Sequence, residues 1–284
     1  MEILKRFDNG SILALVSIDK IRGHEDVKED YLAELTARIE EDGELYKPIL
    51  VVNNDFVVLD GHHRFNACKN IGCKRITAFL IDYFREDVQV EAWYPLILDK
   101  EEADHVFETV KQAGFEVSEV ESEAKMQELV DSRQASIGMI VHDSPFKYFI
   151  TNRTDALTFS EAMKAIVSDL RARQKLPVLK YYNNPDEVKE KLNLGEAHML
   201  IKVPKISKES VITRSNMEEK YPPKTTRHLV PDNVEEYHIP LDRLKEPNPV
   251  EDFEASEEIL AAYEKHMEEH SSTPYESSIE WKFE

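Results

Sequence analysis

The residues around position 60 limit the folds open to this chain more than any other feature of its sequence. The apolar run Phe56–Leu59 leads directly into the polar segment Asp60–Arg64, and apolar residues then recur at helical spacing up to Gly72. This order predicts a buried strand, a tight turn at Gly61 and a short helix that ends at Gly72. A strand, a polar turn and a helix in direct succession indicate a mixed α/β fold.

The first ninety residues contain three further predicted elements. Apolar side chains at helical spacing, followed by Gly43, predict a helix over 29–42. The apolar run Ile49–Val52 and the run Phe56–Leu59 flank a polar turn and predict a hairpin. Another apolar run predicts a strand over 76–84. We assign these elements to a small α/β domain over 1–95.

Helical and strand patterns alternate after residue 95, which predicts a larger mixed α/β domain over 96–250. The patterns place helices near 103–114, 122–132, 159–170 and after Asn184, and strands near 115–117, 136–141, 146–150, 178–182 and 197–203. The last forty residues hold twelve acidic and three basic side chains. Over 251–284 we therefore expect an acidic surface helix followed by a loose, solvated tail.

The composition excludes several classes of protein. The chain has 36 basic and 56 acidic residues, and its formal net charge of −20 is unfavourable for binding nucleic-acid phosphates. No apolar run approaches the roughly 18 residues that cross a bilayer, and the N-terminus lacks the apolar stretch of a secretory signal. Cys68 and Cys73 are too few for a disulfide framework or a four-cysteine zinc site. We expect a cytoplasmic protein with reduced thiols that binds neither nucleic acid nor membranes.

The polar segment Asp60–Arg64 has the composition of a phosphate site. A helix that begins there directs unpaired N–H groups and the positive end of its dipole outward. Arg64 can hold two phosphate oxygens, the two histidines add donors, and Asp60 can hold Mg²⁺ or orient a substrate hydroxyl. The alternative is a plain helix start with exposed histidines. Zinc is disfavoured because the adjacent His62 and His63 cannot both face one ion from a helix.

The order of elements and the polar turn resemble a known superfamily. A strand, a polar loop, a helix, a hairpin and the pattern Gly-x-x-Arg-Phe-x-Ala resemble the ParB/sulfiredoxin superfamily over about residues 10–90. Within it, Asp-Gly-His-His-Arg resembles the signature of the archaeal-type free L-serine kinases. Sulfiredoxin-like enzymes need a catalytic cysteine in this loop, where this chain has His62. ParB-like proteins usually carry Glu-Arg-Arg after the glycine and append helical DNA-binding elements. The kinase branch fits the residues best.

The resemblance implies phosphorylation of free L-serine to O-phospho-L-serine, which feeds cysteine biosynthesis. ADP is the favoured phosphoryl donor, with ATP as the other candidate, and Mg²⁺ is the expected metal. Glu25 matches the family's catalytic carboxylate, which takes the proton of the serine hydroxyl, and Asp60 matches the acidic position before the phosphate turn and is the candidate Mg²⁺ ligand. The diphosphate-binding turn is matched by Gly61, His62, His63 and Arg64. Residues that face the substrate are matched by Trp93, Lys224, Thr225, Thr226 and His228.

Other interpretations stay open at this point. Glu25 can be a surface carboxylate, Trp93 a core or hinge residue, and the segment 221–228 an exposed basic turn. At the level of function, the alternatives are a ParB-like nucleotide-binding regulatory module without kinase activity, and a kinase for another small hydroxyl compound. We expect the nucleotide and serine to bind in the cleft between two domains. The sequence leaves the oligomeric state and the choice between ADP and ATP open.

Overall fold

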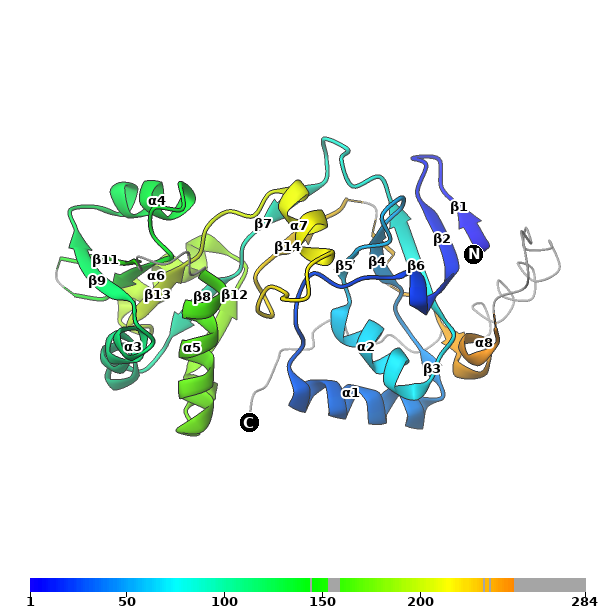
Figure 1. Cartoon of the computed structure of the whole chain (residues 1–284), viewed down its shortest axis with the longest axis horizontal. Helices are drawn as coiled ribbons and strands as arrows, with labels where there is room; N and C mark the ends of the chain where they lie inside the picture. Colours follow the sequence, from blue (N-terminus) through cyan, green and yellow to red (C-terminus); the bar gives the residue numbers. More distant parts are fainter. Residues whose placement is uncertain (144, 153–158, 232, 235, 248–284) are drawn as a thin grey trace. The chain divides into compact units, whose positions relative to one another are not determined.

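The computed structural model in Figure 1 describes residues 1–143, 145–152, 159–231, 233, 234 and 236–247. These residues form two units. Unit 1 contains Met1–Gln89, Lys208–Pro223 and the described residues from His228 onward, and unit 2 contains Val90–Ser207 and Lys224–Arg227. The first unit therefore takes up two later segments that the sequence assigned to the domain over 96–250.

Both units mix helices and strands, so the predicted mixed α/β class is confirmed. The helix and tail predicted over 251–284 lie outside the described residues. Cys68 and Cys73 are buried and free. Among the described helices, none is long and apolar enough to span a membrane.

A five-stranded sheet forms the centre of unit 1. Its order is β1 (Glu2–Arg6), β2 (Ile12–Ser17), β6 (Arg75–Ile81), β4 (Ile49–Val52) and β5 (Val58–Asp60). The central strands β4 and β6 run parallel, whereas the other neighbours are antiparallel. Every residue of β4 and β6 is buried, which explains why β4 is a continuous apolar run and why β6 is apolar apart from Arg75 and Thr77. The strand β5 lies at one edge and leads into the polar turn.

Two helices of unit 1 pack against each other, and one of them follows this turn directly. α2 (His62–Ile71) follows β5 after Gly61 and contacts β4, and α1 (Glu29–Asp42) packs against α2. α1 has the bounds predicted from the sequence, and α2 ends before Gly72 as expected. The remaining elements of unit 1 are η1 (Ile18–Lys20), β3 (Glu44–Leu45), β15 (Ile239–Pro240), α7 (Lys208–Ser215) and α8 (Leu241–Lys245). β3 pairs with β15 in a separate two-stranded sheet.

A buried ion pair attaches the last described segment to unit 1. Arg75 is 1% exposed and its guanidinium lies 2.7 Å from Glu2 and 2.8 Å from Glu246. The backbone N–H of Lys74 donates a 2.8 Å hydrogen bond to the carbonyl of Leu244. A buried guanidinium needs carboxylate partners, and Arg75 finds them at both ends of the chain. These contacts connect β1, β6 and the segment at α8.

A six-stranded sheet forms the centre of unit 2, and all its neighbouring strands are antiparallel. Its order is β12 (Leu179–Tyr182), β8 (Tyr94–Ile97), β13 (Met199–Lys202), β10 (Ile137–Val141), β11 (Lys147–Asn152) and β9 (Glu116–Val120). The other elements of unit 2 are α3 (Lys100–Gln112), α4 (Glu123–Asp131), α5 (Phe159–Ala172), η2 (Leu176–Val178) and α6 (Pro185–Leu194). α4 and α6 share one apolar core with the sheet, and α3 packs against α5. Two short strands, β7 (Gln89–Glu91) and β14 (Arg227–Leu229), pair with each other.

Candidate active site

Gly61 forms the turn between β5 and α2 and is the N-cap residue of α2. Its φ of 93° lies in the left-handed region. A Cβ atom at this position would lie 2.7 Å from both Nη2 of Arg64 and Cγ2 of Ile49, so the turn requires glycine. Because glycine has no side chain, it cannot cap the first N–H groups of α2, which favours an anion at this helix end.

Asp60 and Arg64 pair across this turn. Nη2 of Arg64 donates a 2.6 Å hydrogen bond to Oδ2 of Asp60. Burial opposes the charge of Asp60, but Arg64 and Lys47 outweigh it and lower the pKa of the carboxyl. Nε of Arg64 is buried and has no hydrogen-bond partner among the described residues. The turn thus presents a carboxylate beside a guanidinium that still has a donor to offer.

The two histidines of the turn point to different neighbours. Nε2 of His63 accepts a 3.0 Å hydrogen bond from the backbone N–H of Lys28 at the start of α1, and its ring packs on Tyr31. Nε2 of His62 accepts a 3.3 Å hydrogen bond from the backbone N–H of His24. No group of three or more metal-ligating side chains occurs in the described part of the chain.

His24, the residue before Glu25, lies buried in the interior of unit 1. Its Nδ1 lies 2.7 Å from the carbonyl oxygen of Val58 in β5, and its ring centroid lies 4.6 Å from that of His62. A carbonyl oxygen only accepts, so Nδ1 of His24 carries the proton. Burial, with the neighbouring His62 and His228, lowers the pKa of His24 well below its ordinary value. Burial also lowers the pKa of His62 to about 3, so both rings are neutral at pH 7.

Glu25 is held between this histidine pair and a later segment of the chain. Its backbone pairs with Tyr221: the N–H of Tyr221 donates to the His24 carbonyl at 2.9 Å, and the N–H of Asp26 donates to the Tyr221 carbonyl at 2.8 Å. Oε1 of Glu25 lies 3.8 Å from Nε2 of His24, and the side chain is 10% exposed.

Glu25 also lines a cavity of about 300 Å³ within unit 1. The polar side chains around it include Asn66 and Lys69 of α2 and Lys220 from the segment after α7. The carboxylate therefore has access to a polar space bordered by cations. Nothing in the sequence pointed to Lys220, because it lies far from the motif along the chain.

His228 lies in unit 1 and is hydrogen-bonded through both ring nitrogens. Nδ1 lies 2.9 Å from the carbonyl oxygen of Leu59, and Nε2 lies 2.8 Å from the hydroxyl of Tyr83. Burial lowers the pKa of His228 to about 4. Tyr83 is a residue that the sequence did not single out, because one tyrosine at the end of an apolar run carries no distinctive signal.

The other four residues predicted to face the substrate come together in unit 2. Nε1 of Trp93 donates a 3.1 Å hydrogen bond to the carbonyl of Thr226, and Nζ of Lys224 lies 3.9 Å from a ring centroid of Trp93. Thr225 and Thr226 are buried. Trp93 thus anchors the segment 224–227.

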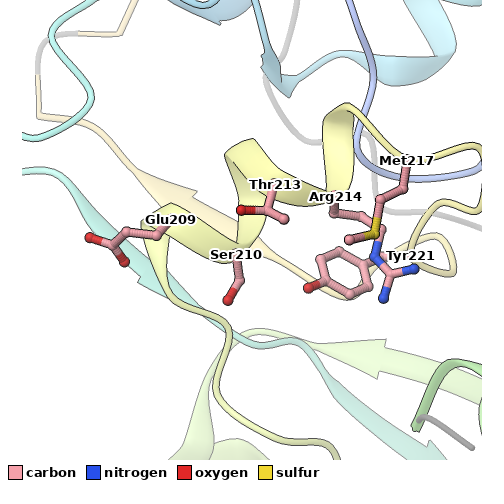
Figure 2. Close-up of a pocket in the computed structure, with 6 residues that line it drawn as sticks. All are labelled: Glu209, Ser210, Thr213, Arg214, Met217 and Tyr221. Carbon is pink, nitrogen blue, oxygen red and sulfur yellow. The ribbon is translucent and has the colours of Figure 1, made fainter.

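A second cavity in unit 1, of about 280 Å³, lies along α7. Figure 2 shows the side chains that line it, from α7 and the segment after it: Glu209, Ser210, Thr213, Arg214, Met217 and Tyr221. The guanidinium of Arg214 lies 4.6 Å from the ring centroid of Tyr221. The sequence did not predict this cavity.

Comparison with known proteins identifies the kind of domain that unit 1 contains. Residues 6–92 match the ParB N-terminal domain. They include Glu25 and the complete turn from Asp60 to Arg64, so the resemblance inferred from the motif is confirmed at the level of the domain.

Relatives that match most of the chain narrow this class. The chain is 29% identical to the ATP-dependent L-serine kinase of Staphylothermus marinus over 238 residues, 81% of this chain and 90% of that protein. It is 25% identical to the ADP-dependent L-serine kinase SerK of Thermococcus kodakarensis, over 81% of this chain and 91% of that protein. A solved structure of a free serine kinase in complex with AMP superimposes with a TM-score of 0.71 at 25% identity, covering 84% of this chain and 95% of that one. The chain is thus similar over most of its length to L-serine kinases, and it shares the fold of the solved free serine kinase.

Proposed function

We propose that this protein transfers a phosphoryl group from ADP or ATP to the hydroxyl of free L-serine. One observation carries the proposal: the hydrogen bond from His24 N–H to His62 connects the Glu25 loop to the turn Asp60–Arg64. A carboxylate suited to act as a base and a turn suited to bind phosphate are thereby held together in unit 1. The homology to L-serine kinases supports the choice of acceptor.

The turn binds the phosphates of the donor. Arg64 offers the terminal N–H groups of its guanidinium, and the first N–H groups of α2 add backbone donors at the positive end of the helix dipole. The positions of His62 and His63 suit a supporting role, because each accepts a hydrogen bond from a backbone N–H of another segment. They hold the loop before α1 against the turn.

Asp60 is the residue that would hold Mg²⁺. Its side chain is 55% exposed beside the phosphate-binding residues, and its lowered pKa keeps it ionised. One carboxylate completed by substrate phosphates is a common Mg²⁺ site in kinases, so the residues present fit this ion. A bound Mg²⁺ would neutralise negative charge on the phosphates of the donor.

Glu25 acts as the general base. The hydroxyl oxygen of serine attacks the terminal phosphorus of the donor, its proton passes to the Glu25 carboxylate, and the bond from that phosphorus to the bridging oxygen breaks. The products are O-phospho-L-serine and the nucleotide shortened by one phosphate. Arg64 stabilises the charge on the transferred group by position and electrostatics.

Trp93, Lys224, Thr225 and Thr226 are proposed to face the serine. The ammonium and hydroxyl groups of this segment suit the substrate carboxylate, and Trp93 fixes the segment through the Thr226 carbonyl. A site that pairs buried polar groups discriminates against analogues that lack a partner group. Supply of phosphoserine to cysteine biosynthesis is the metabolic role proposed for the product, in the cytoplasm.

Phosphorus NMR of a mixture of protein, Mg²⁺, L-serine and either ADP or ATP tests the proposal. We expect a phosphoserine resonance that needs L-serine and a donor, and the comparison of ADP with ATP assigns the donor. Ethanolamine, which lacks the carboxylate, should be a poor acceptor. L-threonine should be disfavoured by a smaller factor, since a methyl-sized misfit is worth roughly 1–3 kcal/mol.

Two outcomes would overturn parts of the proposal. Nucleotide binding without phosphoserine would favour a regulatory module, the second candidate, which is supported by 24% identity to a ParB-like protein of Sulfolobus acidocaldarius over 82% of this chain. Ethanolamine phosphorylated as readily as serine would remove the proposed carboxylate site.

A further inference from the structure

The strand β5 contains a bulge directly before the polar turn. In the antiparallel pair with β4, Leu50 lies opposite Asp60 and the next residue, Val51, lies opposite Val58. Leu59 is therefore an extra residue on β5. A bulge takes a residue out of the regular ladder and redirects the side chains that follow, and such bulges recur next to functional sites.

The carbonyl of Leu59 is bound by a side chain. Nδ1 of His228 lies 2.9 Å from this oxygen, and because a carbonyl has no proton to give, Nδ1 must be the donor. The other ring nitrogen, Nε2, then carries a lone pair. It accepts from the hydroxyl of Tyr83 at 2.8 Å.

Tyr83 is well placed to keep this arrangement. Its side chain is 1% exposed, and burial, with Glu209 nearby, raises the pKa of the hydroxyl, so the hydroxyl remains a donor. Nζ of Lys208 lies 5.5 Å from the ring centroid of Tyr83 and donates to the carbonyl of Arg85. Tyr83 and the half-buried His228 thus form a hydrogen-bonded chain that ends on the bulge.

The neighbouring carbonyl is bound in the same way. Val58 O accepts from Nδ1 of His24 at 2.7 Å. Two successive carbonyls of β5 therefore receive imidazole N–H groups just before Asp60. Both histidines are neutral, because burial disfavours their charged forms.

We propose that His228, held by Tyr83, is a positioning residue that fixes the bulge at Leu59 and thereby aims Asp60 and the start of α2. The expected effect on kcat rests on the proposed function, since it requires that the protein phosphorylates serine. The proposal also assigns Tyr83 a role that the motif does not contain. A ligand role for His228 toward the serine carboxylate would need a free ring nitrogen or a charged ring, and its two nitrogens are bonded to Leu59 and Tyr83.

The first arm of the test measures the tautomer of His228 in the full chain by long-range ¹H–¹⁵N NMR, with the resonance assigned by its loss in His228→Asn. We expect protonated Nδ1 and unprotonated Nε2 in the wild type. In Tyr83→Phe the Nε2 resonance should move, because it loses its donor, whereas Tyr148→Phe in unit 2 should leave it in place. A His228 protonated at Nε2 in the wild type would overturn the proposal. This arm does not depend on turnover.

The second arm compares kinetics and nucleotide binding. Tyr83→Phe and His228→Leu should lower kcat by roughly 10- to 100-fold and weaken nucleotide binding, with the serine KM within about threefold of wild type, because they misplace the turn. His228→Asn should recover most of the loss, since the amide N–H of asparagine can replace Nδ1–H. Tyr148→Phe is the control.

The opposite pattern has a distinct meaning. A serine KM raised more than tenfold, equally in His228→Asn and His228→Leu and with nucleotide affinity unchanged, would make His228 a substrate ligand and overturn the proposal. If the wild type forms no phosphoserine, the proposed function fails on its own, and the tautomer and the nucleotide affinities still decide the positioning role. If Tyr83→Phe does not fold, the His228→Asn and His228→Leu pair decides it.

Discussion

Nη2 of Arg64 lies 2.6 Å from Oδ2 of Asp60, so the last residue of β5 and the first turn of α2 are joined by an ion pair across Gly61. The pair uses one corner of the guanidinium and leaves Nε buried without a partner among the described residues. A phosphate that binds here adds to this pair, and the carboxylate then sets the orientation of the arginine. This geometry makes the contribution of each residue separable by substitution.

Replacement of Arg64 by alanine should weaken nucleotide binding. The loss of a charge-assisted contact is worth about 1.5–3 kcal/mol, or roughly 10- to 150-fold in Kd. Isothermal calorimetry with ADP and ATP measures it. Arg38→Ala, on the exposed face of α1, is the matched control and should leave the affinity unchanged. An unchanged affinity in Arg64→Ala would move the phosphate site elsewhere.

Gly61→Ala and Gly72→Ala compare the two ends of α2. Both residues have a left-handed φ, so each substitution should cost about 1–2 kcal/mol of folding free energy from the backbone alone. A Cβ at Gly72 meets nothing within 4 Å, whereas one at Gly61 lies 2.7 Å from Arg64 and Ile49. We expect Gly61→Ala to be the less stable of the two in urea unfolding and to lose nucleotide affinity. Equal stability and equal affinity of the two variants would contradict the crowding at Gly61.

Glu25→Gln keeps the shape of the side chain and removes the base. Turnover should fall by about 100- to 10,000-fold while nucleotide binding survives. Glu29→Gln, at the exposed start of α1, serves as the control. Activity within a few-fold of wild type in Glu25→Gln would mean that this carboxylate is not the base.

Three histidines of unit 1, the buried His24 and His62 and the half-buried His228, make its stability depend on pH. Burial lowers the pKa of His24 well below its ordinary value, that of His62 to about 3 and that of His228 to about 4. The unfolded chain binds protons at these residues near pH 6.5, before the folded chain does. Their contribution is therefore complete above about pH 6.5 and is lost as the pH falls toward the folded pKa values.

His62 and His228 should each lower the free energy of unfolding by about 1.4 kcal/mol per pH unit as the pH falls through this range, or roughly 2 kcal/mol by pH 5. Urea unfolding at a series of pH values measures the slope. His62→Asn should reduce it by about one proton. A slope that His62→Asn leaves unchanged would show that this ring is charged in the folded protein.

The sequence predicted unit 1 well around the motif because its signals there are local. The helix over 29–42 and the end of α2 at Gly72 depend on apolar spacing and on glycine, which act within one or two turns. Several other elements escaped prediction, among them β8 and α7. β8 contains Pro95, which is tolerated because the pairing with β13 covers only Leu96 and Ile97. α7 is short, polar and rich in residues of modest helix propensity.

The candidate site was predictable only where its residues are consecutive in sequence. The turn at Asp60–Arg64 can be recognised from the polar composition of its consecutive residues. The contacts of Glu25 with Tyr221 and of His228 with Tyr83 join positions that are distant in the sequence. No local pattern encodes such pairs, because each member alone resembles an ordinary core or surface residue. The motif also could not reveal that His62 and His63 point to different neighbours.

The backbone pairing of Glu25 with Tyr221 limits where a chain of this kind can be cut or recombined. The ParB N-terminal domain match ends at residue 92, yet the segment that holds Glu25 in place comes from Lys208–Pro223. A fragment cut at the end of the match would keep the phosphate turn and the carboxylate but lose the partner that orients the latter. Recombination that exchanges everything after residue 92 must therefore carry a compatible replacement for Tyr221. Unit 1 is built from separate stretches of the chain and cannot be transferred as one continuous segment.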